Sequence, residues 1–109
     1  MNLNEIRHII WDWNGTLVDD AQLCVELMNG IRSKRSLPSI SLESYRDTFD
    51  FPVIEYYKRI GFDFEIESFA SLSDEFINEY VNSRKSLPLH SGALAALKFF
   101  RQRNLPQCV

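Results

Sequence analysis

The sequence predicts an α/β fold in which a parallel sheet carries a long helical insertion. Its first apolar run, HIIW at residues 8–11, is short and β-branched, as in strands buried on both faces of a parallel sheet. Apolar residues at helical spacing then fill roughly residues 18–88, and a second extended apolar run, LPQCV, closes the chain. A strand, a helical excursion and a second strand form the layout of a parallel pair joined by a crossover.

The first helix is expected directly after the turn that follows the first strand. Asp19 or Asp20 can cap it, because a carboxylate accepts the N–H groups that the first helical turn leaves unpaired. Leu23, Leu27 and Ile31 recur every four positions and give the helix one apolar face. We therefore expect this face to pack against another part of the protein.

Three further helices and a second strand follow in order. Ser41 can cap a short helix that runs to about Phe49, and Pro52 can begin another that Gly61 ends. A longer helix is expected before the segment RKSLP, on apolar residues spaced by three and four: Phe69, Leu72, Phe76 and Tyr80. The segment HSGALAALKFFRQRN predicts the last helix, with one apolar side formed by Ala93, Ala96, Leu97 and Phe100. The expected division is a partial core of residues 1–17 and 89–109 and a helical insertion of residues 18–88.

Composition and charge exclude several classes of function. The chain has 109 residues with 45% hydrophobic and 13% aromatic content, which is enough for a packed core in one domain or part of one. Its formal charge of -3 is not gathered into blocks of one sign, so we expect no nucleic-acid partner and no binding to an anionic membrane. The N-terminal segment MNLNEIRHII resembles neither a signal peptide nor a membrane span.

The cysteines and histidines carry no recognisable metal pattern. Cys24 and Cys108 are too few and too far apart for a zinc knuckle or a disulfide framework, so two reduced, mostly buried thiols are expected. Reduced thiols are typical of a cytoplasmic protein, which is the predicted location. His8 and His90 are interpreted as structural or surface residues, because no second ligand lies at a suitable spacing.

The candidate site begins with Asp12, which ends the first strand. Ligands of open α/β sheets bind at the carboxyl ends of the strands, where Asp12 lies. A carboxylate there, beside a turn whose N–H groups can face an anion, suits an aspartate that attacks phosphorus. Gly15 lets backbone approach a ligand closely, and Thr16 can add a hydroxyl to a phosphoryl group. A second interpretation stays open, in which Asp12 only accepts N–H bonds from an ordinary turn.

The string DWNGTLVDD resembles motif I of the haloacid dehalogenase (HAD) superfamily, whose phosphatase members read D-x-D-G-T-L-x-D-S. The residues that match in register are Asp12, Gly15, Thr16, Leu17 and Asp19. The helical insertion looks like the cap of the phosphoglycolate-phosphatase-like branch, and LPLHSGALAALKFFRQRN resembles the turn and helix by which that branch returns to its core. The resemblance implies a partial HAD-like (Rossmann-like) parallel-sheet core with an inserted α-helical cap.

The same resemblance implies a Mg²⁺-dependent phosphatase, a hydrolase that acts on a small phosphomonoester. Asp12 would be the nucleophile that forms an aspartyl-phosphate, and would also bind Mg²⁺. The backbone carbonyl of Asn14 would be a second metal ligand, while Gly15 and Thr16 would hold the phosphate. A hard cation with oxygen ligands suits this chemistry, because it neutralises charge that develops on the phosphoryl group.

Asn14 departs from the family pattern. It stands where the phosphatases carry an acid/base Asp, so it counts among the catalytic positions although its amide exchanges no proton at neutral pH. Loss of a positioned acid/base typically lowers the rate by about 10²–10⁴-fold. The alternative function is therefore a catalytically impaired HAD-like protein that binds phosphate or regulates.

The later motifs of the family are also missing. Its Ser or Thr after the second strand, its Lys and its acidic pair have no counterpart before Val109. We therefore expect the chain to be the N-terminal part of a longer enzyme, inactive by itself, with the C-terminal part as partner. A third interpretation, a plain helical interaction module, rests on the high helix content and these missing motifs.

Overall fold

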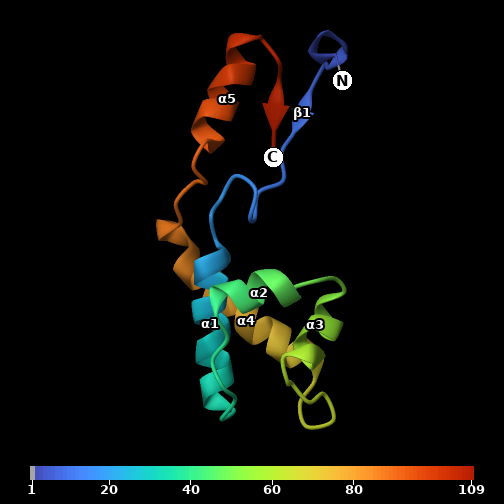
Figure 1. Ribbon diagram of the computed structural model, residues 1–109, viewed down its shortest axis with the longest axis vertical. Coiled ribbons are helices and arrows are strands. Elements are labelled where there is room, and N and C mark those ends of the chain that lie inside the picture. Colours follow the sequence, from blue (N-terminus) through green and yellow to red (C-terminus); the bar gives the residue numbers. More distant parts are fainter. Residues whose placement is uncertain (1) are drawn as a thin grey trace. The chain divides into compact units, whose positions relative to one another are not determined.

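A computed structural model of the protein describes residues 2–109, and it is a mostly helical α/β chain with a small parallel sheet. The chain divides into two compact units. The described residues up to Asp20, together with Leu87–Val109, form what we call the sheet unit, and Ala21–Ser86 form the helical unit (Figure 1). From the sequence, the boundaries were predicted after residues 17 and 88.

The sheet unit is built on one parallel strand pair. Strands β1 (Ile9–Ile10) and β2 (Gln107–Cys108) pair in parallel, with Ile9 opposite Gln107 and Ile10 opposite Cys108. The Trp11 N–H extends this ladder by donating to the Cys108 carbonyl at 2.8 Å. The predicted parallel pairing of the two apolar runs is therefore confirmed. A short 3-10 turn, η1 (Leu3–Glu5), precedes β1.

Helix α5 (Ala93–Gln102) covers one face of this sheet. The Trp11 ring lies 6.0 Å from that of Phe100, and the Gln107 amide donates to the Leu97 carbonyl at 3.0 Å. The helix begins at Ala93 because Gly92 precedes it with a φ of 85°, a left-handed conformation that a glycine adopts without strain.

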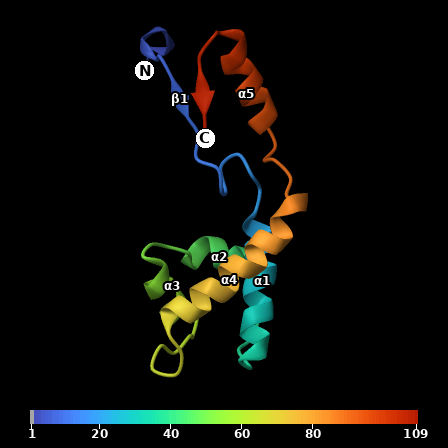
Figure 2. The ribbon, with the colours of Figure 1, turned by 180° about the vertical axis from the view of Figure 1, so that it is seen from behind.

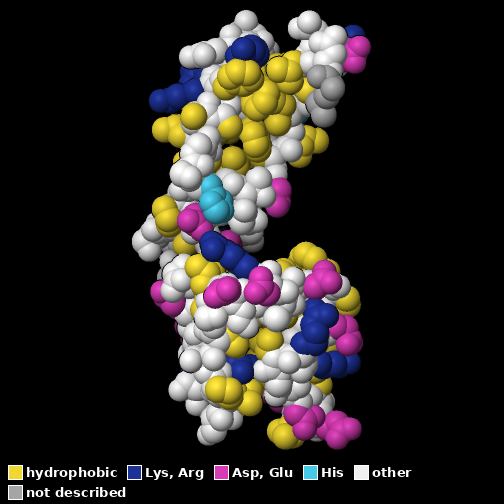
Figure 3. All heavy atoms as spheres, in the orientation of Figure 1, with side chains coloured by type: hydrophobic (Ala, Val, Ile, Leu, Met, Phe, Trp, Pro, Cys, Tyr) yellow, Lys and Arg dark blue, Asp and Glu magenta, His cyan; other side chains and the backbone are white. Residues whose placement is uncertain are grey.

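The other face of the sheet is open, which corrects the prediction of a first strand buried on both faces. Ile10 is 78% exposed, and Cys108 is exposed rather than buried as predicted. Figure 3 shows hydrophobic side chains gathered at the surface over the sheet and α5. Among the described residues the sheet has only β1 and β2, so β1 has a neighbour on one side only.

The helical unit contains α1 (Ala21–Lys34), α2 (Leu42–Thr48), α3 (Val53–Arg59), α4 (Phe69–Ser83) and the short η2 (Arg84–Ser86). Helices α1 and α4 lie side by side, as Figures 1 and 2 show from opposite directions. The predicted cap at Ser41 is confirmed, because its hydroxyl accepts the Ser44 N–H at 3.0 Å. Ser68 caps α4 in the same way, through the Ser71 N–H at 3.1 Å.

An aromatic-rich core holds the helical unit together. Its buried members come from α1, α3, α4 and the loop after α3: Met28, Ile31, Tyr56, Tyr57, Phe62 and Leu72. Burial of this apolar surface is the main stabilising contribution. Arg32 is only 3% exposed, donates to the carbonyls of Pro38 and Ile60, and lies over the Phe62 ring. Burial lowers the pKa of its guanidinium.

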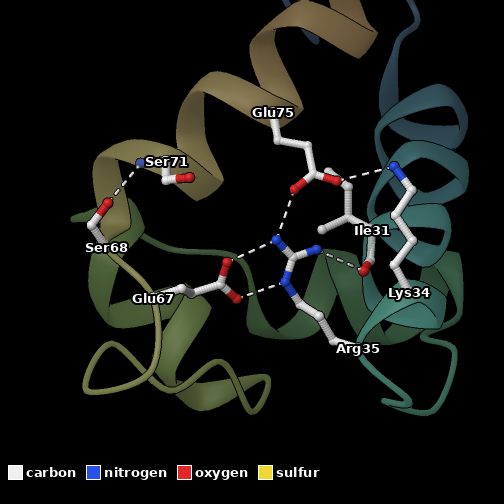
Figure 4. Close-up of polar contacts among 7 residues, drawn as sticks. All are labelled: Ile31, Lys34, Arg35, Glu67, Ser68, Ser71 and Glu75. Atoms are coloured by element: carbon white, nitrogen blue, oxygen red, sulfur yellow. Dashed lines mark hydrogen bonds and ion pairs between the residues drawn. The ribbon is translucent and has the colours of Figure 1, made fainter.

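An ion-pair network ties the end of α1 to the segment before α4 and to the middle of α4 (Figure 4). Arg35 binds Glu67 through two parallel bonds of 2.6 and 2.7 Å, and donates to Glu75 at 2.7 Å. Lys34 approaches the other oxygen of Glu75 at 3.1 Å. The hydrogen bond from Arg35 lowers the pKa of the Glu75 carboxyl. The network lies at a partly covered surface, where such pairs are stronger than fully exposed ones.

Within residues 2–109, every helix is too short or too polar to cross a membrane.

Candidate functional site

Asp12 lies one residue beyond the last backbone bond of β1, at the carboxyl end of the parallel pair. Its side chain is exposed, and both oxygens are hydrogen-bonded. Oδ1 accepts the Trp13 N–H at 3.0 Å, and Oδ2 accepts the Thr16 hydroxyl at 2.9 Å. Two donors on different oxygens fix the orientation of the carboxylate, while each oxygen keeps a further lone pair.

The backbone after Asp12 folds into a compact turn around one carbonyl group. The Trp13 carbonyl oxygen accepts the N–H groups of Thr16, Leu17 and Val18 at 3.1–3.2 Å. The Gly15 N–H donates to the Val18 carbonyl at 2.9 Å. This pattern brings Thr16 back toward Asp12, so the bond between their side chains follows from the turn.

Gly15 has a φ of 72°, in the left-handed region that costs other residues about 1–2 kcal/mol. A Cβ at this position would lie 3.9 Å from the nearest side-chain atom, Oδ1 of Asp20, which is ordinary van der Waals contact. The turn therefore needs the conformational freedom of glycine, and space inside the unit does not explain the residue.

The far end of the turn is buried and hydrogen-bonded to the returning chain. Leu17 and Val18 are 2% and 3% exposed. The Leu17 carbonyl accepts the His90 N–H at 2.9 Å, and the Asp19 N–H donates to the Pro88 carbonyl at the same distance. These bonds to the returning chain hold the turn in place after Asp12.

The acidic residues after the turn differ in their surroundings. Asp20 is 6% exposed and directly precedes α1, the position at which a capping residue was expected. Asp19 is half-exposed, and its Oδ1 lies 3.8 Å from Nε2 of His90, so the two form an ion pair only when the imidazole is protonated. Both residues follow the turn that orients Asp12.

The oxygen donors of this turn fit Mg²⁺ in kind but are few. The carboxylate of Asp12 and the carbonyl of Asn14 are hard ligands of the type that Mg²⁺ prefers. Across residues 2–109, no group of three or more His, Cys, Asp or Glu side chains could hold a metal ion. A near-octahedral ion takes about six oxygens, so most of its ligands would have to be water, substrate or other polypeptide.

The side chains of Asp12 and Thr16 are hydrogen-bonded to each other, a contact that was not predicted from the sequence. Thr16 was expected to hold a phosphoryl group, and in this structure its hydroxyl donates to Asp12 instead. The turn around the Trp13 carbonyl was also missed, because a backbone acceptor leaves no signal in the side-chain sequence. The spacing of four between Asp12 and Thr16 was the one available clue.

Comparison with protein-family models, curated proteins and solved structures gave no match for this chain.

Proposed function

We propose that the chain carries the nucleophile of a HAD-like phosphoryl-transfer enzyme, with the sheet unit as part of the core and the helical unit as its cap. The observation that carries the proposal is the Asp12 carboxylate, exposed at the carboxyl end of β1 and oriented by the Trp13 N–H and the Thr16 hydroxyl. An attacking oxygen needs a fixed direction and an open approach. Asp12 has both.

In the proposed reaction, a carboxylate oxygen of Asp12 attacks the phosphorus of a small phosphomonoester. The new bond joins that oxygen to phosphorus, and the bond from phosphorus to the alcohol oxygen breaks. The departing oxygen leaves with the electron pair and takes up a proton. Water then attacks the acyl phosphate, releases inorganic phosphate and restores the carboxylate.

Thr16 and Gly15 act on the phosphoryl group in this proposal. The Thr16 hydroxyl has one proton to donate, so it exchanges its bond to Asp12 for a phosphoryl oxygen once Asp12 has attacked. Gly15 keeps the turn in its left-handed conformation and allows the substrate to approach the backbone closely. A bound Mg²⁺, held by the Asp12 carboxylate and the Asn14 carbonyl, would neutralise negative charge on the phosphoryl group.

Asn14 limits the second half of the reaction. An amide neither protonates a leaving alcohol nor accepts a proton from water, so the acyl phosphate on Asp12 should be long-lived. The same residue favours the alternative proposal, a HAD-like protein that binds phosphate or regulates without turnover.

The remaining groups of a complete site would come from a partner polypeptide. The proposal assigns to it a Ser or Thr, a Lys and an acidic pair, which supply phosphate contacts and metal ligands. The open face of the sheet, with Ile10 78% exposed, offers a surface on which such a partner can extend the core.

The test is Mg²⁺-dependent phosphorylation of the protein by acetyl phosphate, whose acetate leaving group needs no proton. We expect protein-bound phosphate to form slowly, without sustained phosphate release. Asp12→Asn should abolish the bound phosphate. The matched control is Asp47→Asn, which removes an exposed carboxylate from α2 in the helical unit and should change nothing.

Bound phosphate that survives in Asp12→Asn would refute the nucleophile. Rapid Mg²⁺-dependent turnover by the chain alone would refute the need for a partner. Reversible binding of inorganic phosphate with no covalent labelling would favour the alternative.

A further inference from the structure

Helix α1 has a second face, which borders α4 beside the residues that pack into the helical unit. The packed side carries the buried residues Val25, Met28, Ile31 and Arg32. Helical spacing places another set of residues together on the remaining side of the helix, and we call it the α1 outer face: Leu23, Glu26, Leu27, Gly30 and Lys34. Glu26, Gly30 and Lys34 are exposed, while Leu23 and Leu27 are partly exposed, although the sequence predicted these two leucines on the packed face with Ile31.

Gly30 lies in the middle of this face, and no contact within the described residues requires a glycine there. It sits in the interior of α1, where alanine stabilises a helix better than glycine. A Cβ at Gly30 would meet no atom within 4 Å, so packing within the unit does not require a glycine here. Glycine at an exposed helical position does allow another backbone to approach closely.

Gly30 is one of the residues that line a hollow of about 160 Å³ on the surface of the helical unit. Its lining combines apolar and charged residues of α1 with one glutamate of α4: Glu26, Leu27, Gly30, Ile31, Lys34 and Glu79. The Lys34 side chain is 61% exposed, although its ammonium group approaches Glu75. A partner on this face would therefore meet both signs of charge around a glycine.

We propose that the α1 outer face binds a second copy of this chain, with the two α1 helices antiparallel and crossing at Gly30. Glu26 precedes Gly30 by four residues, and Lys34 follows it by four. A two-fold axis through the crossing point places Glu26 of each copy against Lys34 of the other. The same antiparallel crossing brings the two glycines together, where the missing side chains permit close contact.

Charge complementarity favours a second copy over a different partner. Glu26 accepts a bond from the Gln22 amide at 3.0 Å and Lys34 pairs with Glu75, but the carboxylate keeps further lone pairs and the ammonium further N–H groups. One symmetric crossing can therefore still form two opposite-charge pairs between Glu26 and Lys34. A contact centred on one helix is small, so we expect a weak, concentration-dependent dimer. Neither the site at Asp12 nor its proposed chemistry is needed for this association.

The experiment is sedimentation velocity of the full chain over a concentration series, with charge reversals on the α1 outer face. Glu26→Lys and Lys34→Glu should each weaken self-association by about tenfold or more, because each creates like-charge pairs across the axis. An equimolar mixture of the two single variants should associate again, since both lysines of one variant then face glutamates of the other. Gly30→Leu should abolish association by filling the crossing point.

Control variants separate association from folding. Glu43→Lys reverses an exposed charge on α2, away from this face, and should leave self-association unchanged. Thermal melting checks that Lys34→Glu, which loses its pair with Glu75, remains folded. A chain that is monomeric throughout the series would overturn the proposal, as would a mixture of the single variants that fails to associate while both remain folded.

Discussion

The two units of the chain differ in how much core each one has. The helical unit buries a cluster of aromatic and aliphatic side chains with further aromatics packed around it. In the sheet unit the buried hydrophobic residues are Leu17, Val18 and Ala93. Large apolar residues of that unit lie at its surface instead: Leu3, Ile10, Trp13, Leu89, Leu94, Phe99 and Val109. Stability is therefore concentrated in one unit and the candidate chemistry in the other.

This contrast indicates that the sheet unit needs further polypeptide to be stable, whereas the helical unit does not. A two-stranded sheet covered on one face is marginal by itself, because three or more strands or fuller coverage are usually needed. Helices with a continuous aromatic core need no such addition. Substitutions in the helical unit should therefore change stability with little effect on phosphorylation, and substitutions at the turn after β1 should do the reverse.

The largest effect is expected from Asn14→Asp in the sheet unit. An aspartate can activate the water that attacks the acyl phosphate, so the lifetime of protein-bound phosphate should fall by about 10²–10⁴-fold, or roughly 3–5 kcal/mol. The measurement is the decay of protein-bound phosphate after removal of acetyl phosphate. Thermal stability should be nearly unchanged. An unaltered lifetime would show that another group already moves the proton, or that the site is built for binding.

Leu72→Ala should have the next largest effect, on stability alone. Leu72 is fully buried at the centre of the helical core, and loss of such a side chain leaves a cavity that costs about 2–5 kcal/mol. The free energy of unfolding in urea is the measurement. Leu94→Ala, at a 54% exposed position of α5, is the control and should cost about 0.5 kcal/mol or less. Equal costs at the two positions would contradict the contrast between the units.

Arg35→Gln should destabilise the helical unit by a smaller amount. It removes the bonds to Glu67 and Glu75 at a site only 24% exposed, for which we expect about 1–2 kcal/mol. Lys58→Gln, which breaks a fully surface pair with Glu55, is the control and should cost at most about 0.5 kcal/mol. If both variants lose the same free energy of unfolding in urea, the network around Arg35 is not more stabilising than an ordinary surface pair.

The network also predicts how the stability of the folded chain changes with pH in the acid range. Because Arg35 lowers the pKa of Glu75, the unfolded chain takes up this proton at a higher pH than the folded one. The contribution of Glu75 is present above its ordinary pKa of 4.5 and is lost as pH falls through the lower folded value. Urea unfolding across this acid range should show a steeper loss for the natural chain than for Arg35→Gln. Parallel curves would contradict this assignment.

Ser41→Ala should give the smallest effect. It removes the acceptor for the Ser44 N–H at the start of α2, a loss worth about 0.5–1 kcal/mol for an exposed cap. Ser39→Ala, two residues earlier and outside the helix, is the control. Circular dichroism during thermal unfolding should separate the two variants, and identical melting would exclude the cap as a stabilising contact.

The sequence predicted most of the local structure because its signals are local. Ser41, Pro52 and Gly61 mark helix ends by their own backbone preferences, and the structure begins or ends α2 and α3 beside them. The two apolar runs likewise predicted the parallel pairing of β1 with β2. The predicted burial of β1 on both faces was wrong, because an apolar run has the same sequence pattern whether the second face of the strand is covered or open.

The polar contacts between residues far apart in the chain could not be predicted from the sequence. Arg35 follows α1, where a cation is favourable at any helix end, so its position does not indicate a specific partner. Its partners, Glu67 and Glu75, lie far along the chain, at separations of 32 and 40 residues, and no local pattern connects them. At the candidate site, the residue types Asp12, Gly15 and Thr16 came from a motif, whereas the bond from Thr16 to Asp12 required the folded turn.

The most direct test of the central claim is to find which side chain carries the phosphoryl group. After reaction with acetyl phosphate and Mg²⁺, borohydride reduces an aspartyl-phosphate to homoserine, and peptide mass spectrometry locates the change. We expect homoserine at Asp12 in the sheet unit, and none in Asp12→Asn. Homoserine at aspartates of the helical unit, or none at Asp12 in the natural chain, would contradict the assignment of the chemistry to the turn after β1.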